Sequence, residues 1–134
     1  MAPQDVAGSI SRFVNAVNAG EFGAALAHFT GDATIVEDIP PYRWQGPQAG
    51  SQWLAAMGEN AARSGLTGIA MRLGDATRIE VDGDNAYAVY AAVLTLSGDD
   101  LRLRSDGCLT FTLQRAGTGW LINALSWGGA APQP

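Results

Sequence analysis

The chain has 134 residues, a net charge of −5 and 47% hydrophobic against 16% charged residues, which is the composition of one globular domain with a single core. Its eight positive charges are all arginines scattered along the chain, so we expect no nucleic-acid partner, and no apolar stretch is long enough to cross a membrane. Because Cys108 and His28 are the only residues of their kinds and Met1 to Asp5 carries no export signal, we expect a cytoplasmic protein without a disulfide, metal or cofactor.

Three helices are predicted in the first half of the chain. The first opens with Pro3 and ends at Gly20, the second is short and covers residues 21–29, and the third runs from Pro47 to Gly65. The apolar side chains that recur in them at helical spacing are Val6, Ile10, Phe13, Val14, Val17, Phe22, Ala25, Leu26, Phe29, Trp53, Leu54, Met57 and Ala61.

Strands are predicted for the rest of the chain. A short strand over residues 33–38 is β-branched in its centre and stops before Pro40-Pro41, because proline cannot continue a ladder. Gly74 and Gly107 fall inside later strands, where glycine often marks a bulge or bend, so we expect a curved sheet. Four long antiparallel strands joined as a meander by hairpin loops are predicted over residues 69–81, 86–96, 101–115 and 120–127.

These elements predict an α+β fold. Three helices that precede a long meander must bury their apolar stripes on one face of the sheet, and straight helices cannot fill a concave face completely. We therefore expect residues 1–128 to form one cone-shaped domain, in which three N-terminal helices pack on a strongly curved antiparallel sheet around a central pocket for a small hydrophobic molecule. Residues 129–134 are expected to form a loose C-terminal tail.

Two segments carry a family resemblance. The run Phe29-Thr-Gly-Asp-Ala33-Thr-Ile-Val-Glu-Asp38-Ile-Pro40 and the final Gly119-Trp120-Leu-Ile-Asn-Ala-Leu-Ser-Trp127 resemble the nuclear transport factor 2-like superfamily, which includes ketosteroid isomerases and SnoaL-like polyketide cyclases. The resemblance covers nearly the whole chain and implies the fold more strongly than the function. The Asp38 segment is most similar to the ketosteroid isomerases, whose related run ends in the catalytic base, so the resemblance implies that Asp38 is a general base.

Strand alternation predicts how this carboxylate is oriented. It places Asp38 on the same side as Val36, toward the apolar interior, and Glu37 on the opposite face. Burial would then raise the pKa of Asp38, since Arg43 is the only cation close to it in sequence. The equally supported alternative is that Asp38 accepts backbone hydrogen bonds in the Pro40-Pro41 turn.

The other parts of the isomerase machinery do not match this sequence. The resemblance calls for a tyrosine on the first helix and a protonated aspartate on a late strand to stabilise the dienolate. Phe13 stands at the first position, and Phe111 or its apolar neighbours stand at the second. Two supporting tyrosines are replaced by Phe29 and Leu54. We therefore expect no oxyanion hole and no steroid isomerisation by the standard mechanism.

Several side chains are candidates for the pocket wall. Alternation places Asn123 inward on the last strand, where it could orient a ligand oxygen, and lets only one of Tyr87 and Tyr90 face the cavity without deciding which. The expected ligand-binding residues are Phe13, Val17, Phe29, Tyr42, Trp53, Met57, Tyr87, Leu109, Phe111, Asn123 and Trp127.

Residues near Asp38 have two possible roles each. Tyr42 and Trp44 could form a lid over a bound ring, or could only pack the loop down. His28 could shuttle protons, although packing is the commoner role of a lone helical histidine, and Arg43 is expected to be solvated rather than paired with a substrate.

We therefore predict a pocket protein that binds a small, largely apolar, oxygenated molecule, with Asp38 as the base that removes a proton next to a carbonyl, as in an isomerase, cyclase or lyase. The alternatives are a non-catalytic carrier or sensor, which the missing oxyanion donors favour, and a dimeric interaction module with a vestigial pocket. A homodimer through the polar outer strand face of Thr110, Thr112 and Gln114 is compatible with all three.

Overall fold

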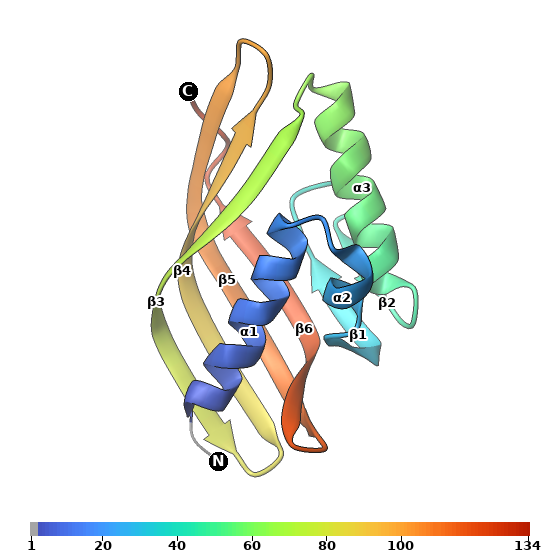
Figure 1. Cartoon of the computed structure of the whole chain (residues 1–134), viewed down its shortest axis with the longest axis vertical. Helices are drawn as coiled ribbons and strands as arrows, with labels where there is room; N and C mark the ends of the chain where they lie inside the picture. The colour runs from blue at the N-terminus through green and yellow to red at the C-terminus, as the bar shows by residue number, and fades with distance from the viewer. Residues whose placement is uncertain (1–2) are drawn as a thin grey trace.

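The computed structural model describes residues 3–134, which form three helices on one face of a six-stranded sheet (Figure 1). The helices are α1 Pro3–Asn18, α2 Phe22–Leu26 and α3 Ala49–Arg63. The strands are β1 Phe29–Val36, β2 Arg43–Gln45, β3 Gly68–Asp82, β4 Asn85–Ser97, β5 Arg102–Ala116 and β6 Gly119–Gly129. Met1 and Ala2, part of the segment expected to carry no export signal, lie outside the described residues.

The strand order is β2-β1-β6-β5-β4-β3, and all neighbours are antiparallel except β1 and β6, which run parallel. The α+β fold and the four-stranded meander are thus confirmed. The register of β3 against β4 shifts between Leu73 and Arg78, beside Gly74, so the predicted irregularity lies where the glycine indicated it. Within residues 3–134, no helix has both the length and the hydropathy that a membrane crossing requires.

Two predictions in the first half of the chain are wrong. The second helix ends at Leu26 and, after the turn Ala27-His28, β1 begins at Phe29, because the backbone N–H of Ile122 on β6 donates to the carbonyl of His28 at 2.7 Å. The loop after Asp38 contains the additional strand β2, because Tyr42, with φ of 74°, reverses the chain and pairs it back onto β1. Pairing with neighbouring strands therefore overrides the local signals for a helix end and a loop.

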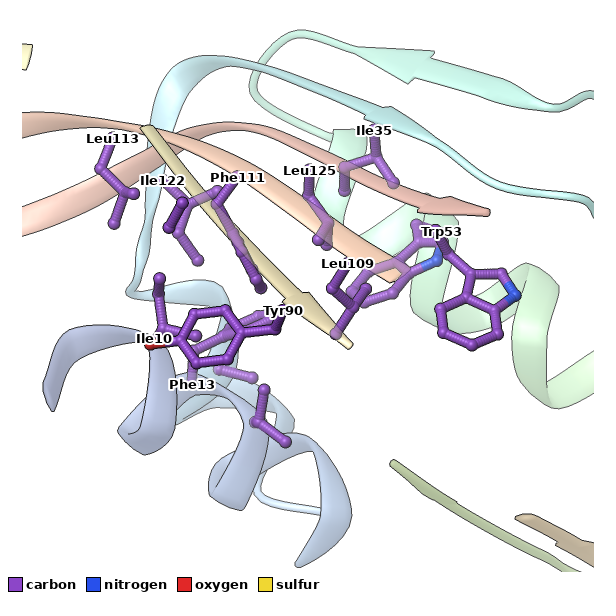
Figure 2. Packing of buried hydrophobic residues seen from close by; sticks show 14 of the residues in the cluster. Ile10, Phe13, Ile35, Trp53, Tyr90, Leu109, Phe111, Leu113, Ile122 and Leu125 are labelled. Atoms are coloured by element: carbon purple, nitrogen blue, oxygen red, sulfur yellow. The ribbon is translucent and has the colours of Figure 1, made fainter. Parts of the chain in front are cut away.

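The core lies between α1 and the concave face of the meander. Figure 2 shows Ile10 and Phe13 on α1 facing Phe111 and Ile122 on the sheet. The ring of Phe111 is fully buried and meets the rings of Phe13 and Tyr90 edge-on, at centroid distances of 6.4 and 6.3 Å. The predicted apolar stripe of the first helix is therefore the face that packs on the sheet.

The C-terminal residues, which we expected to be loose, are instead bonded to β5. Arg104 and Gln133 exchange two backbone hydrogen bonds of 2.7 and 3.0 Å, and the hydroxyl of Ser105 donates to the carbonyl of Ala130 at 2.6 Å. The reason is that β6 pairs with β5 only as far as Gly107, so the first residues of β5 have backbone groups left to satisfy. The C-terminal residues thus bond to the part of β5 that β6 does not reach.

Gly107 on β5 is a position where the surroundings require glycine. A Cβ there would lie 2.7 Å from the Cα of Gly129 and 2.8 Å from the indole of Trp127, and would also collide with the carbonyl oxygen of Gly128. We expect Gly107→Ala to lower the free energy of unfolding by about 1–3 kcal/mol, because backbone and a buried ring must move.

Denaturant unfolding measures this effect, and Gly58→Ala on α3 is the matched control. Gly58 is exposed, and a Cβ there would meet nothing within 4 Å. Alanine also favours the helix, so the control should raise the free energy of unfolding by up to about 1 kcal/mol. Equal losses in both variants would contradict the close-approach explanation.

Candidate functional site

A cavity of about 600 Å³ lies between the helices and the sheet. The last turn of α1 holds one side of it, because the side-chain amide of Asn18 bonds to both backbone groups of Met71 on β3, at 2.8 and 2.9 Å. The volume suits a small molecule with one or a few rings. Six of the predicted ligand-binding residues line the cavity: Phe13, Val17, Trp53, Met57, Leu109 and Trp127.

Two other predicted aromatic residues lie behind the cavity wall. Phe111 is fully buried in the core. Phe29 packs edge-on against Phe13 and Trp53, with ring centroids 5.2 and 6.3 Å away. Both residues therefore support the wall without lining the cavity.

Two predicted tyrosines lie outside the cavity. Tyr87 is 38% exposed on the outer face of β4, whereas Tyr90 is buried, so Tyr90 is the tyrosine that points inward. Tyr42 is exposed beside β2, and Trp44 is buried. Neither residue lines the cavity, so the aromatic pair after Asp38 does not cover it as a lid: Trp44 packs the hairpin, and Tyr42 is exposed.

Asn123, which we placed inward, is bonded to the outer strand face. The hydroxyl of Thr112 donates to its side-chain carbonyl oxygen, and Thr112 lies opposite the buried Phe111 and Leu113 face of β5. The cause is a register shift between β5 and β6 at Thr112, which puts Ile122 and Leu125 both inside and breaks simple alternation. Asn123 is thus unable to orient a ligand in the cavity.

Glu37, not Asp38, is the carboxylate that the fold buries. Ala33 and Ile35 are the inward residues of β1, and Glu37 continues their period of two with 9% of its surface exposed. Val36 is 43% exposed and Asp38 is exposed as well. The predicted orientation of these carboxylates is therefore wrong by one residue, although Asp38 also lines the cavity, at its exposed edge.

The Glu37 side chain is held by α3. The indole Nε1 of Trp53 donates a hydrogen bond of 3.1 Å to its Oε1, across 16 residues of sequence. The indole is itself stacked on Phe13, at a centroid distance of 6.2 Å and an interplanar angle of 21°. Residues from α1, α3 and the end of β1 thus fix the position of one buried carboxyl group.

The pKa of Glu37 is raised from 4.5 to about 7. Burial is the main cause, because it penalises the charged form, and the negative charge of Asp38 adds to it. The Trp53 hydrogen bond favours the carboxylate and acts in the opposite direction. Near neutral pH the Glu37 carboxyl can therefore both accept and donate a proton, as a general acid–base group must.

The remaining polar candidates do not join this site. His28 lies between α2 and β1, not on a helix, and packs edge-on against Phe13 at 6.1 Å. Burial and the nearby Arg12 lower its pKa, which is the behaviour of a packed neutral imidazole. Arg43 is exposed on β2 and donates to Gln45. In residues 3–134, no three His, Cys, Asp or Glu side chains come together as metal ligands.

Sequence reasoning missed three features of the site: Glu37 itself, the donor role of Trp53, and Ser105. Trp53 was expected as apolar wall, and nothing in its spacing from Glu37 indicates the hydrogen bond. Ser105, also missed, lines the cavity and is buried, and its hydroxyl is used by the C-terminal residues.

Comparisons with known proteins agree with this architecture. A model of the SnoaL-like domain family matches residues 4–126. No curated protein matches the sequence.

Solved structures with the same fold include two enzymes by name. A scytalone dehydratase-like protein from Novosphingobium aromaticivorans has a TM-score of 0.79 at 10% identity, over 97% of this chain and 85% of the other. The hexachlorocyclohexane dehydrochlorinase LinA-type3 from Novosphingobium barchaimii has a TM-score of 0.78 at 13% identity, over 98% and 88%. A nuclear transport factor 2-like superfamily protein from Salmonella enterica has a TM-score of 0.76 at 16% identity, over 96% and 91%. Likenesses at this level of identity concern the fold.

Proposed function

Since the chain belongs to the SnoaL-like domain family, we propose that it binds a small, largely apolar, oxygenated molecule in the cavity and transfers a proton at a carbon of that molecule. The observation that carries this proposal is the buried Glu37 carboxyl, held by Trp53 in the wall of an apolar cavity. A carboxylate that burial has made more basic is a better acceptor of a proton from carbon.

The chemistry would be an isomerisation or an elimination. Glu37 takes the proton from a carbon next to a carbonyl, and the electron pair of the C–H bond moves into an enolate. The protonated Glu37 then returns the proton to another carbon, or to a leaving group as the new double bond forms. Elimination is supported by the names of two structural neighbours, a dehydratase-like protein and a dehydrochlorinase.

In this proposal Glu37 takes the role that the family resemblance implied for Asp38. Both residues line the cavity, but only Glu37 is buried and held by a hydrogen bond from the wall. Asp38 acts on the reaction through its charge, which raises the pKa of Glu37. Asp38 as the base itself stays a prediction.

A carrier or sensor is the second candidate, because the wall lacks the tyrosine and the late-strand aspartate that would donate to a substrate oxygen. Phe13 has no hydroxyl group, the N–H of Trp53 is bonded to Glu37, and the hydroxyl of Ser105 is bonded to Ala130. A protein that only binds its ligand needs no stabilisation of an enolate.

Incubation with ring ketones in deuterated water separates these functions. Ligand binding should raise the melting temperature, by the equivalent of about 2.7 kcal/mol at a hundredfold excess over Kd. NMR should then show deuterium entering the carbon next to the carbonyl. Binding without exchange would favour the carrier, and neither binding nor exchange would favour the interaction module.

We also propose the homodimer through the outer sheet face. That face is half-buried at Thr110 and Thr112, and carries the exposed ring of Tyr87 with the guanidinium of Arg78 at 5.7 Å. Light scattering should give twice the 14.0 kDa chain mass, and Tyr87→Glu should give the chain mass because it buries a charge in the interface. A wild-type protein that stays at the chain mass at high micromolar concentration contradicts the dimer.

A further inference from the structure

The cavity wall carries charge of one sign. Its ionisable lining residues are Glu37 and Asp38, and within the described part of the chain no arginine and no histidine lines it. The other polar side chains of the wall are neutral: Asn18, Asn60, Thr67 and Ser105. An anionic ligand would therefore meet two carboxyl groups and no cation.

Glu37 has acceptor capacity left for a ligand. A carboxylate has about four lone-pair positions, and the Trp53 N–H is the side-chain donor bonded to it. The nearest charged neighbour of Glu37 is the carboxyl group of Asp38. The charge of Asp38 and the burial of Glu37 both oppose the ionisation of Glu37. A backbone hydrogen bond at Asp38 also favours the Glu37 carboxylate, so what the site lacks is a positive charge.

The apolar walls are suited to a cation as well. Four aromatic residues line the cavity, namely Phe13, Phe22, Trp53 and Trp127. Aromatic faces attract ammonium groups through their quadrupoles, most strongly when water is excluded. A ring-sized body would fill the apolar part, and a positive group would compensate the carboxylates.

We propose that the cavity binds an apolar ring that carries a protonated amine, and that it discriminates against the same ring carrying a carboxylate. This inference rests on the proposed function, because it names the ligand class for the same cavity. The exposed Asp38 pairs with the ammonium group at the edge of the cavity, and the buried Glu37 lies nearer the apolar ring, where it transfers the proton.

The pH dependence of binding follows from Glu37. The cavity residues contributed by α1, α3, β3, β4, β5 and β6 include no titratable side chain, so we assign the pH response to the buried carboxyl group of Glu37. A cationic ligand binds the ionised carboxylate best, so its affinity should rise as the pH rises through about 7. A neutral ligand lacks this dependence, because it gains no charge pair.

Three naphthalene derivatives that differ only in charge test the proposal by titration calorimetry. They are 2-naphthylmethylamine, 2-naphthylmethanol and 2-naphthoate. At about pH 8 the amine should bind at least about tenfold more tightly than the alcohol, and the carboxylate at least about tenfold more weakly than the alcohol. The affinity of the amine should fall about tenfold between about pH 8 and about pH 5.5, where Glu37 is protonated.

Paired variants identify the source of the preference. Glu37→Gln with Asp38→Asn should abolish the advantage of the amine over the alcohol. Glu80→Gln with Asp82→Asn removes the same formal charge at the C-terminal end of β3, whereas the cavity is lined by the beginning of that strand. This second pair should leave the advantage of the amine unchanged. An advantage that survives the first pair, or disappears with the second, overturns the proposal.

The series on the wild-type protein also separates this inference from the proposed function. Binding of the alcohol or the carboxylate as tightly as the amine overturns the charge preference and leaves the cavity as a ligand site. Binding of none of the three at about 1 mM, a very weak affinity, overturns both the inference and the ligand-binding part of the proposed function.

Discussion

Relative to the wild type, the Glu37→Gln variant is expected to gain up to about 3 kcal/mol in free energy of unfolding between about pH 4 and about pH 8. The folded wild type keeps Glu37 protonated up to a pKa of about 7, whereas the unfolded chain releases this proton near 4.5. Between these values the folded state binds more protons, so wild-type stability falls as the pH rises. Glutamine has the same shape and no charge, and escapes this loss.

Urea unfolding of both proteins from about pH 4 to about pH 8 measures the effect. The informative quantity is how the difference in free energy of unfolding between the variant and the wild type changes with pH. The pH-independent part of that difference depends on the hydrogen bonds that the new amide forms. Glu80→Gln, which removes a carboxylate 59% exposed in an ion pair with Arg78, should change little with pH relative to the wild type. Parallel curves for Glu37→Gln and the wild type would show that burial does not oppose the charge of Glu37.

The fold could be predicted because its signals are local. The apolar stripe from Val6 to Val17 repeats at helical spacing over about three turns, and hairpin loops separate four long strands. Each of these elements is specified by residues within one segment. The beginning of β1 and the whole of β2 have no such signal, since they are strands only because β6 and β1 lie beside them.

The site was predicted less well, because a one-residue error in alternation reverses every side chain that follows. Ile35 and Val36 are both β-branched and apolar, so their sequence does not show which one points inward. In the structure Ile35 pairs with Leu125 on one side and Trp44 on the other and is buried, which turns Glu37 inward with it. A register shift produced the same kind of error at Asn123.

With a substrate identified by deuterium exchange, Glu37→Gln is expected to lower kcat by a factor of about 10² to 10⁴, the usual contribution of a general base. Ligand affinity for a neutral substrate should change little, because the glutamine oxygen can still accept the hydrogen bond of Trp53. The matched comparison is Asp38→Asn, which should lower kcat less than about tenfold if Asp38 acts only through its charge.

The pH profile distinguishes the roles of the two carboxyl groups. A base with the pKa of Glu37 makes kcat/KM rise with pH up to about 7 and then level off. Removing the negative charge of Asp38 takes away one cause of that raised pKa, so Asp38→Asn should move the rise to lower pH. The opposite pattern, in which Asp38→Asn abolishes turnover and Glu37→Gln does not, would make Asp38 the base, and the burial of Glu37 would then serve only to shape the cavity.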